Sequence, residues 1–290
     1  MDLIKARGRL MAIGGGEDKE KDCVILKEFV RLAGGDEACV VVMTTATDSP
    51  EEVAAEYTKV FNRLGAKRIE AIDVSQRSDA MKAESIEAVK KATGIFFTGG
   101  DQLHITSLMG STDLQHAVVE AYENGTIVAG TSAGAAMMGN SMILTGDSDE
   151  NPRFGCVEMA PGTDLIVGCM VDTHFSQRGR HGRLLTAVAH YPQDIGFGID
   201  ENTAIIVNKN VFKVIGAGAV TVIDGGAMTY TDVPYVKDGE SIALAGIQLH
   251  VLSNGHKFDL KNRQMIVPTQ KQPKTKRAIV NDSGRKTNKK

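Results

Sequence analysis

One serine stands between two glycines in the run Gly130-Thr131-Ser132-Ala133-Gly134, which directly follows the apolar stretch "TIVA". The pattern G-x-S-x-G is typical of a tight strand-to-helix turn that exposes a serine, with glycines where the neighbouring backbone leaves no room for a Cβ atom. Such a turn also points the backbone N–H of Ala133 toward the position where an oxyanion would form. We therefore predict that Ser132 is a nucleophile.

A second pair of glycines, Gly99 and Gly100, ends the apolar run "GIFF". Glycine amides at a strand end have no side chain to keep a ligand away, so either one could supply a second N–H to an oxyanion. A simple turn at the end of a strand would use the same residues. The local pattern alone does not separate these two interpretations.

A nucleophilic serine requires a base and a group that orients the base. His174 lies in the densest polar stretch of the chain, "VDTHFSQRGRHGR", and is the first candidate for the base. For the acid, the candidates are Glu201, Asp200 and Asp172, and periodicity does not choose among them. His116 and His190 fall inside predicted helices and are expected to be structural. Four other histidines stay open as bases: His104, His181, His250 and His256.

Three arginines, Arg178, Arg180 and Arg183, lie within six residues at the start of a predicted helix, with no acidic partner close by in the sequence. Guanidinium groups bind carboxylates and phosphates through paired hydrogen bonds. The cluster is therefore interpreted either as an anion-recognition site or as a solvated helix face.

The elements that must position these residues alternate between short apolar runs and amphipathic segments. One example is the helix predicted over residues 18–34, "DKEKDCVILKEFVRLAG", which ends at a glycine. Apolar runs without polar alternation indicate a mostly parallel sheet sandwiched between helices, an α/β fold, with a β-rich half after residue 200. Ligands gather at the carboxyl ends of such strands, where "GGGED", "TGGDQ" and "GTSAG" all fall.

Length and charge suggest one α/β domain over residues 1–263 and a basic tail over 264–290 that could be disordered. Residues 261–290 hold ten Lys and Arg against one Asp, a net charge of +9, so residues 1–260 carry −12. The N-terminal apolar run is too short for a signal peptide, and no stretch approaches the roughly 20 apolar residues of a membrane span. We expect a cytoplasmic protein that does not associate with membranes.

Several classes of site are not indicated. The cysteines lack zinc-site spacing, H-E-x-x-H is absent, and neither G-x-G-x-x-G nor G-K-[ST] follows a strand. The sequence therefore predicts no metal and no cofactor. Basic residues are not interleaved with aromatic ones in residues 1–260, so binding of nucleic acid is not expected either.

Five motifs taken together, "IGGGEDK", "FFTGGDQLHITSLMGS", "GTSAGAAMMG", "VDTHFSQRGRHGRL" and "GIDENTA", resemble the cyanophycinases over roughly residues 8–260. These are dipeptidase E-like serine peptidases on the flavodoxin-like fold of class I glutamine amidotransferases. The resemblance implies Ser132 as nucleophile, His174 as general base and Glu201 as orienting acid, with the amides of Gly100 and Ala133 as oxyanion hole. It also implies a substrate pocket lined by Gln102, Asp172, Thr173, Arg178, Arg180 and Arg183.

The resemblance further implies the substrate. Cyanophycin has an aspartate backbone with an arginine joined to each β-carboxyl, and enzymes of this family cut it from an end to release β-Asp-Arg dipeptides without a metal or cofactor, typically as homodimers. The chain departs from the family pattern at Thr173, where a glutamine is expected; the shorter hydroxyl side chain loses reach and an amide donor.

Three alternatives stay open. The first is a dipeptidase E-like enzyme that acts on soluble aspartyl peptides. The second is an esterase of the α/β-hydrolase type, which would use Ser132 with Asp200 and either His250 or His256. The third is a binding protein that has kept the fold without catalysis.

Overall fold

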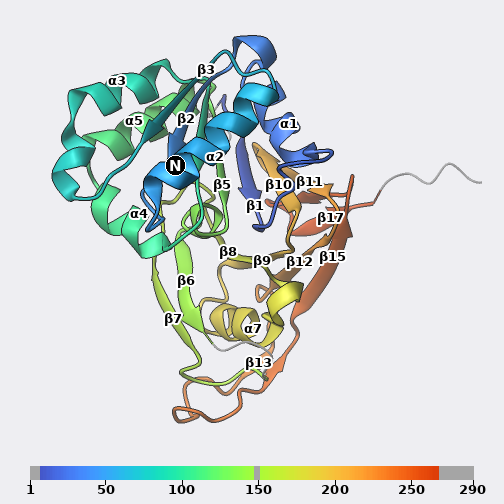
Figure 1. The fold of residues 1–290 in the computed structure, drawn as a ribbon. Helices are drawn as coiled ribbons and strands as arrows, with labels where there is room; N and C mark the ends of the chain where they lie inside the picture. Colours follow the sequence, from blue (N-terminus) through green and yellow to red (C-terminus); the bar gives the residue numbers. More distant parts are fainter. Residues whose placement is uncertain (1–6, 147–150, 268–290) are drawn as a thin grey trace, which may run out of the picture.

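The computed structural model describes residues 7–146 and 151–267, in which strands and helices alternate at first and strands dominate later (Figure 1). The strands are β1 (Leu10–Ile13), β2 (Cys39–Met43), β3 (Arg68–Ile72), β4 (Gly94–Phe97), β5 (Ile127–Thr131), β6 (Ser141–Gly146), β7 (Val157–Pro161), β8 (Cys169–Thr173), β9 (Ile195–Ile199), β10 (Thr203–Asn208), β11 (Val211–Gly216), β12 (Ala219–Asp224), β13 (Tyr230–Thr231), β14 (Leu244–Ala245), β15 (Gln248–Ser253), β16 (Lys257–Asp259) and β17 (Gln264–Ile266). The helices are α1 (Val24–Leu32), α2 (Pro50–Arg63), α3 (Ala83–Lys91), α4 (Gln102–Met109), α5 (Asp113–Asn124), α6 (Ala133–Ala136) and α7 (His181–His190), with 3₁₀ turns at Gly35–Glu37, Arg77–Met81 and Ser176–Arg178.

The main sheet has nine strands in the order β17-β16-β11-β10-β1-β5-β4-β2-β3 within the described residues. The five strands β1, β5, β4, β2 and β3 are parallel to one another. The strands β10, β11, β16 and β17 join the sheet through antiparallel pairs. The predicted α/β fold is therefore confirmed, and the β-rich second half extends the parallel sheet with hairpins. Among the described helices, none is long and apolar enough to cross a membrane.

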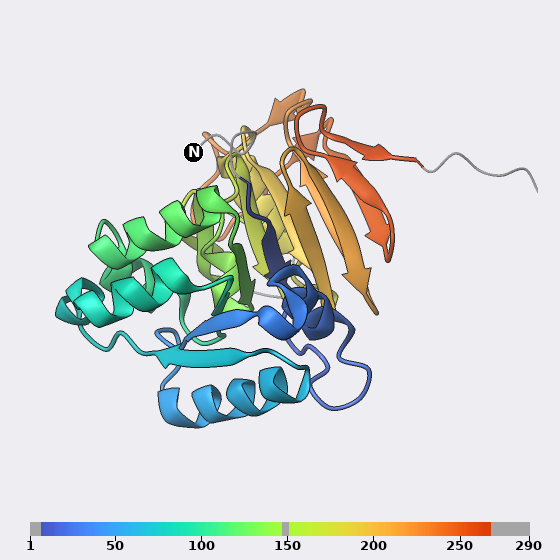
Figure 2. The ribbon, with the colours of Figure 1, turned by 90° about the horizontal axis from the view of Figure 1, so that it is seen from above.

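Helices cover both faces of the parallel part of this sheet, as Figure 2 shows. Alternate residues of β2 contribute to two separate cores: Val41 and Met43 pack with α3 and α5, and Val40 and Val42 pack with α1 and α2. Strands that bury side chains on both faces require continuous apolar runs, which explains why the sequence shows no polar alternation there.

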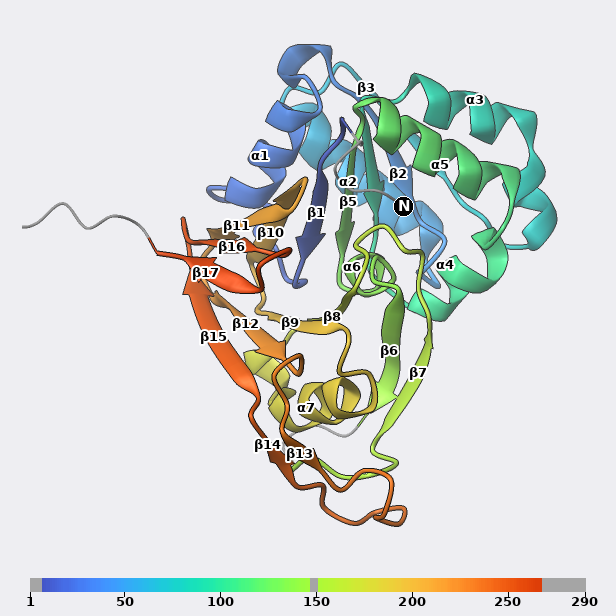
Figure 3. The same cartoon turned by 180° about the vertical axis from the view of Figure 1, so that it is seen from behind.

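A second sheet, β15-β12-β9-β8, carries the C-terminal part of the site. Figure 3 shows α7 between this sheet and the β6–β7 ribbon, and α7 contacts β9, β12 and β7. The strands β8 and β9 are parallel, with Thr173 opposite Ile199, so the residues after each strand emerge side by side. Likewise, Ile13 is opposite Thr131 in the main sheet, which brings the ends of β1 and β5 together.

Two boundaries differ from the sequence predictions. The helix predicted over 18–34 begins only at Val24, because the Asp18 carboxylate accepts hydrogen bonds from the backbone N–H groups of Glu20, Lys21 and Cys23 and holds that segment as a loop. The strand β17 lies beyond residue 263 and pairs with β16, while Met265 packs against the core. The remainder of the predicted tail, residues 268–290, lies outside the described residues.

Candidate active site

Ser132 occupies the turn between β5 and α6, with φ of 52° and ψ of −113°. This backbone conformation is strained for a residue with a side chain and is characteristic of functional turns. A Cβ atom on Gly130 would lie 2.0 Å from the Gly134 carbonyl oxygen, and one on Gly134 would lie 2.5 Å from the Phe97 carbonyl oxygen. Both glycines of the G-x-S-x-G pattern are therefore required by close backbone packing.

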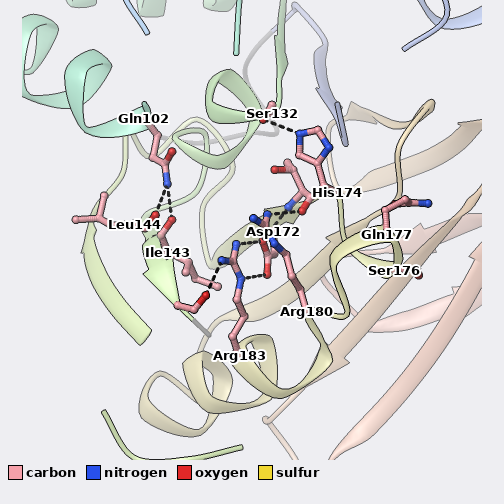
Figure 4. Close-up of polar contacts among 12 residues, drawn as sticks. Gln102, Ser132, Ile143, Leu144, Asp172, His174, Ser176, Gln177, Arg180 and Arg183 are labelled. Atoms are coloured by element: carbon pink, nitrogen blue, oxygen red, sulfur yellow. Dashed lines mark hydrogen bonds and ion pairs between the residues drawn. The ribbon is translucent and has the colours of Figure 1, made fainter. Parts of the chain in front are cut away.

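A chain of hydrogen bonds joins Ser132, His174 and Glu201. The Ser132 Oγ atom is 3.0 Å from His174 Nε2, and His174 Nδ1 is 2.7 Å from Glu201 Oε1 (Figure 4 shows the first contact). His174 follows β8 with φ of 48°, and its backbone N–H donates to the Gly14 carbonyl after β1. Four strand ends thus meet at one point, which is the arrangement that nucleophile, base and orienting acid require.

The other candidate acids have different partners. Both oxygens of Asp200 accept backbone N–H groups, from Ser176 and Ala219 at 3.0 Å each. Asp172 accepts hydrogen bonds from Arg180 and Arg183. All seven histidines lie in the described residues. Of these, only His174 has a hydrogen bond to Ser132. The other six contact other groups or solvent: His104, His116, His181, His190, His250 and His256. The esterase arrangement of Asp200 with His250 or His256 is therefore not assembled.

The loop after β1 packs directly on this chain. A Cβ atom on Gly15 would lie 2.3 Å from Cε1 and 2.4 Å from Nε2 of His174, and one on Gly16 would lie 3.1 Å from Glu201 Oε2. The Glu201 backbone N–H also donates to the Gln177 side chain at 3.0 Å. The imidazole thus occupies the space that a side chain at position 15 would fill, and the φ of Gly15, 89°, also favours glycine.

The substitution Gly15→Ala is expected to lower the rate constant for covalent labelling of Ser132 by a fluorophosphonate about 100-fold, because a displaced base no longer accepts the serine proton. The measurement is the labelling rate followed by mass spectrometry. Gly35→Ala is the matched control: Gly35 also has positive φ, 66°, but a Cβ there meets nothing within 4 Å. Equal labelling rates for the two variants would contradict the assigned role of this contact.

Two backbone N–H groups adjoin the serine. Neither the Ala133 nor the Gly100 N–H donates to an acceptor in the described part of the chain. Gly100 has φ of 140°, and a Cβ there would lie 1.8 Å from the Ala46 carbonyl oxygen, so this turn admits only glycine. Gly99 lies against the Ser132 side chain, where its Cβ would be 3.3 Å from that of the serine. The turn predicted at Gly99-Gly100 is therefore beside Ser132.

The arginine cluster has an acidic partner that the sequence analysis missed. Arg183 donates to both oxygens of Asp172, with 2.8 Å from Nε to Oδ2, and Arg180 donates to Asp172 Oδ1 at 3.3 Å and to the Thr173 carbonyl at 2.6 Å (Figure 4). The side chain of Asp172 is only 1% exposed. Burial lowers the pKa of Arg180 to about 10, which leaves it charged at neutral pH. The third arginine, Arg178, is exposed.

The Gln102 side chain makes no hydrogen bond to the arginine network in the described residues. Its amide nitrogen donates to the carbonyls of Ile143 and Leu144 at 2.6 and 3.1 Å, which ties the start of α4 to β6 (Figure 4). Its amide oxygen has no partner in the described residues. The structure therefore joins Asp172, Thr173, Arg180 and Arg183 in one network, without Arg178 or Gln102.

A pocket of about 580 Å³ opens at Ser132 and His174. Its walls come from the loop after β1 and from α2, and include Glu17 and Tyr57, which the sequence analysis did not select. Glu17 belongs to the "GGGED" motif at a strand end, so its position was a signal of a ligand site. Tyr57 lies within an ordinary amphipathic helix and gave none.

Residues 10–215 match the family model described as Peptidase family S51. A cyanophycinase from Geminocystis herdmanii is 38% identical over 260 residues, which cover 89% of this chain and 96% of that relative. A cyanophycinase from Trichormus variabilis is 35% identical over 259 residues, which cover 89% and 87%. A solved peptidase from an acI-B1 Actinobacterium has the same fold, with a TM-score of 0.63 and 21% identity over 88% of this chain and 98% of that one. The chain therefore belongs to peptidase family S51.

Proposed function

We propose that this protein is a serine peptidase that hydrolyses cyanophycin from an end and releases β-Asp-Arg dipeptides. The observation that carries the proposal is the Ser132–His174–Glu201 hydrogen-bond chain, with contacts of 3.0 and 2.7 Å, in a chain that is 38% identical to a cyanophycinase over nearly its whole length. The same motifs would serve a dipeptidase E-like enzyme for soluble aspartyl peptides. No contact among the described residues of the site favours that alternative.

In the proposed reaction, Ser132 Oγ attacks a backbone carbonyl carbon of the polymer while His174 Nε2 accepts its proton. Glu201 accepts the Nδ1–H hydrogen bond and stabilises the imidazolium ion. The N–H groups of Ala133 and Gly100 bind the developing oxyanion. His174 then protonates the leaving amine, and water hydrolyses the acyl-enzyme by the same route.

The arginine network is proposed to recognise substrate carboxylates. Arg178 is exposed, and Arg180 is 12% exposed and charged, so these two guanidiniums are the ones that a carboxylate would meet. Asp172 and Arg183 are satisfied by each other and are proposed to act by orienting Arg180. Thr173 would contribute through its carbonyl, which also holds Arg180, and Gln102 through its amide oxygen.

The experiment that tests the proposal is digestion of insoluble cyanophycin by the purified protein, with mass spectrometry of the soluble products. We expect β-Asp-Arg dipeptides from the wild type, and nothing from plain polyaspartate, which lacks the arginyl branch. If cyanophycin stays undissolved while soluble aspartyl peptides are cleaved, the alternative substrate replaces it. A cytoplasmic location is a further proposal, as is a homodimer, which the resemblance to the family implies.

A further inference from the structure

Glu17 is a buried carboxylate in the wall of the pocket beside Ser132. It is only 6% exposed and accepts hydrogen bonds from the Tyr57 hydroxyl and from Thr131 Oγ1, the latter at 2.6 Å. Thr131 is the residue directly before Ser132, so Glu17 contacts the immediate neighbour of the proposed nucleophile. The proposed mechanism does not use this carboxylate.

Glu17 makes no ion pair with another residue of the part of the chain that the structure describes. No Lys, Arg or His nitrogen of residues 7–146 or 151–267 lies within ion-pair distance of it. The nearest candidate in sequence, Lys19, instead pairs with Glu56 at 2.7 Å and lies 4.4 Å from the centroid of the Tyr57 ring. The two hydroxyl donors are neutral groups and satisfy only part of the hydrogen-bonding capacity of a carboxylate. Buried charges in proteins are ordinarily paired with an opposite charge.

The remaining charges around the pocket make it more negative. The lining includes three further carboxylates, Asp18, Glu20 and Glu56, against the two ammonium groups of Lys19 and Lys21. Backbone hydrogen bonds from Lys21, Cys23 and Glu20 lower the pKa of Asp18 to about 2, so it is ionised at neutral pH. A cationic ligand would therefore gain from the whole wall as well as from Glu17.

The acidic residue within the arginine network is not available for such a ligand. Asp172 already holds two guanidiniums of the protein itself, and its side chain is 1% exposed. Two groups of charge thus adjoin the Ser132–His174 pair: Arg180 holds the carbonyl of Thr173, next to His174, and carboxylates from the loop after β1 and from α2 line the pocket. A substrate that carries both carboxylates and guanidiniums matches this division.

We propose that the pocket beside Ser132 binds a guanidinium side chain of the substrate, with Glu17 as its anionic partner and specificity determinant. A carboxylate with unused lone pairs accepts two parallel N–H bonds from a guanidinium, and a pocket of about 580 Å³ is large enough for an arginyl side chain. The proposal rests on the proposed function, since it assigns a place to the arginyl branch of cyanophycin.

The test compares two short polymer fragments, one with an arginyl branch and one with citrulline, which has nearly the same shape and no charge. The ratio of kcat/KM for the two fragments is measured with the wild type and with Glu17→Gln. We expect the wild type to prefer the arginyl fragment and the variant to reduce this preference about tenfold or more, chiefly through KM. Because both rates come from one preparation, their ratio does not depend on how much of the variant is folded.

Asp22→Asn is the matched control. Asp22 is exposed in the same loop, does not line the pocket, and loses the same unit of charge. Its preference for the arginyl fragment should equal that of the wild type. If Glu17→Gln slows both fragments equally, Glu17 only holds the Ser132 turn, and the proposal is wrong.

Failure of the proposed function would be recognised separately, as the absence of cleavage of either fragment by the wild type. Binding of the two fragments to Ser132→Ala, with and without Glu17→Gln, would then decide the proposal by calorimetry. A preference for the arginyl fragment that Glu17→Gln removes supports the guanidinium site even without cleavage. Equal binding of the two fragments to Ser132→Ala overturns it.

Discussion

Replacing Ser132 by alanine is expected to lower the rate of β-Asp-Arg release from cyanophycin by at least about 10⁴-fold. The Oγ atom is the group that would form the acyl-enzyme, and its hydrogen bond in the described structure is the 3.0 Å contact with His174 Nε2. The base stays oriented by Glu201 at 2.7 Å, so the loss is in chemistry rather than in assembly of the site. We expect the free energy of unfolding to change by less than about 1 kcal/mol, because one partly exposed hydrogen bond is lost.

The measurement is the initial rate of dipeptide release, with thermal unfolding of each variant in parallel. Ser176→Ala is the matched control, since Ser176 is an exposed serine two residues after His174 and its hydroxyl makes no hydrogen bond in the described residues. It should keep the wild-type rate. A Ser132→Ala protein that retains a tenth of the wild-type rate would exclude Ser132 as the nucleophile that forms an acyl-enzyme.

Features that depend on local backbone were predictable from the sequence. The G-x-S-x-G turn is one, because the strain at Ser132 and the 2.0 Å approach at Gly130 require glycines at fixed spacing. The parallel strands are another, because strands buried on both faces need continuous apolar runs. The positions of motifs after β1, β4 and β5 followed from the rule that the carboxyl ends of such strands share one edge.

Features that depend on side chains from distant segments were not predictable in the same way. The sequence pattern did not choose among Glu201, Asp200 and Asp172 as the acid that contacts His174. The parallel packing of β8 and β9 places Glu201 against the imidazole and Asp200 against backbone amides. The acidic partner of the arginine cluster was overlooked because Asp172 is 8 and 11 residues before Arg180 and Arg183. A strand end and a helix bring them together.

The loop that forms the pocket shows how one side chain overrides helix propensity. Residues 18–23 read as the first turn of a helix, yet the Asp18 carboxylate binds three backbone N–H groups and ends that possibility. The loop that results carries Glu17 and Lys19 to the walls of the pocket. Such local competition between a side chain and the helix is the reason why helix starts are less predictable than helix centres.

Replacing Asp172 by alanine is expected to lower the free energy of unfolding by about 3–5 kcal/mol, because Arg183 would stay buried without its counterion. Arg183 donates to both oxygens of Asp172, its side chain is 8% exposed, and Arg180 shares the same carboxylate at 3.3 Å. For a chain of this size the change corresponds to a fall in Tm of roughly 10 °C. Differential scanning calorimetry measures both quantities.

Two further variants test whether the loss of stability comes from a buried arginine without a counterion. Glu70→Ala removes an ion pair with Arg68 in which the side chains are 39% and 59% exposed, and should cost less than about 1 kcal/mol. The double variant Asp172→Leu/Arg183→Leu removes both buried charges together and should be more stable than Asp172→Ala. If Asp172→Ala were no less stable than Glu70→Ala, Asp172 would be open to solvent and free to bind substrate directly. The predicted instability would instead assign Asp172 to holding Arg180 and Arg183 in place, in agreement with our proposal that Glu17 binds the substrate guanidinium.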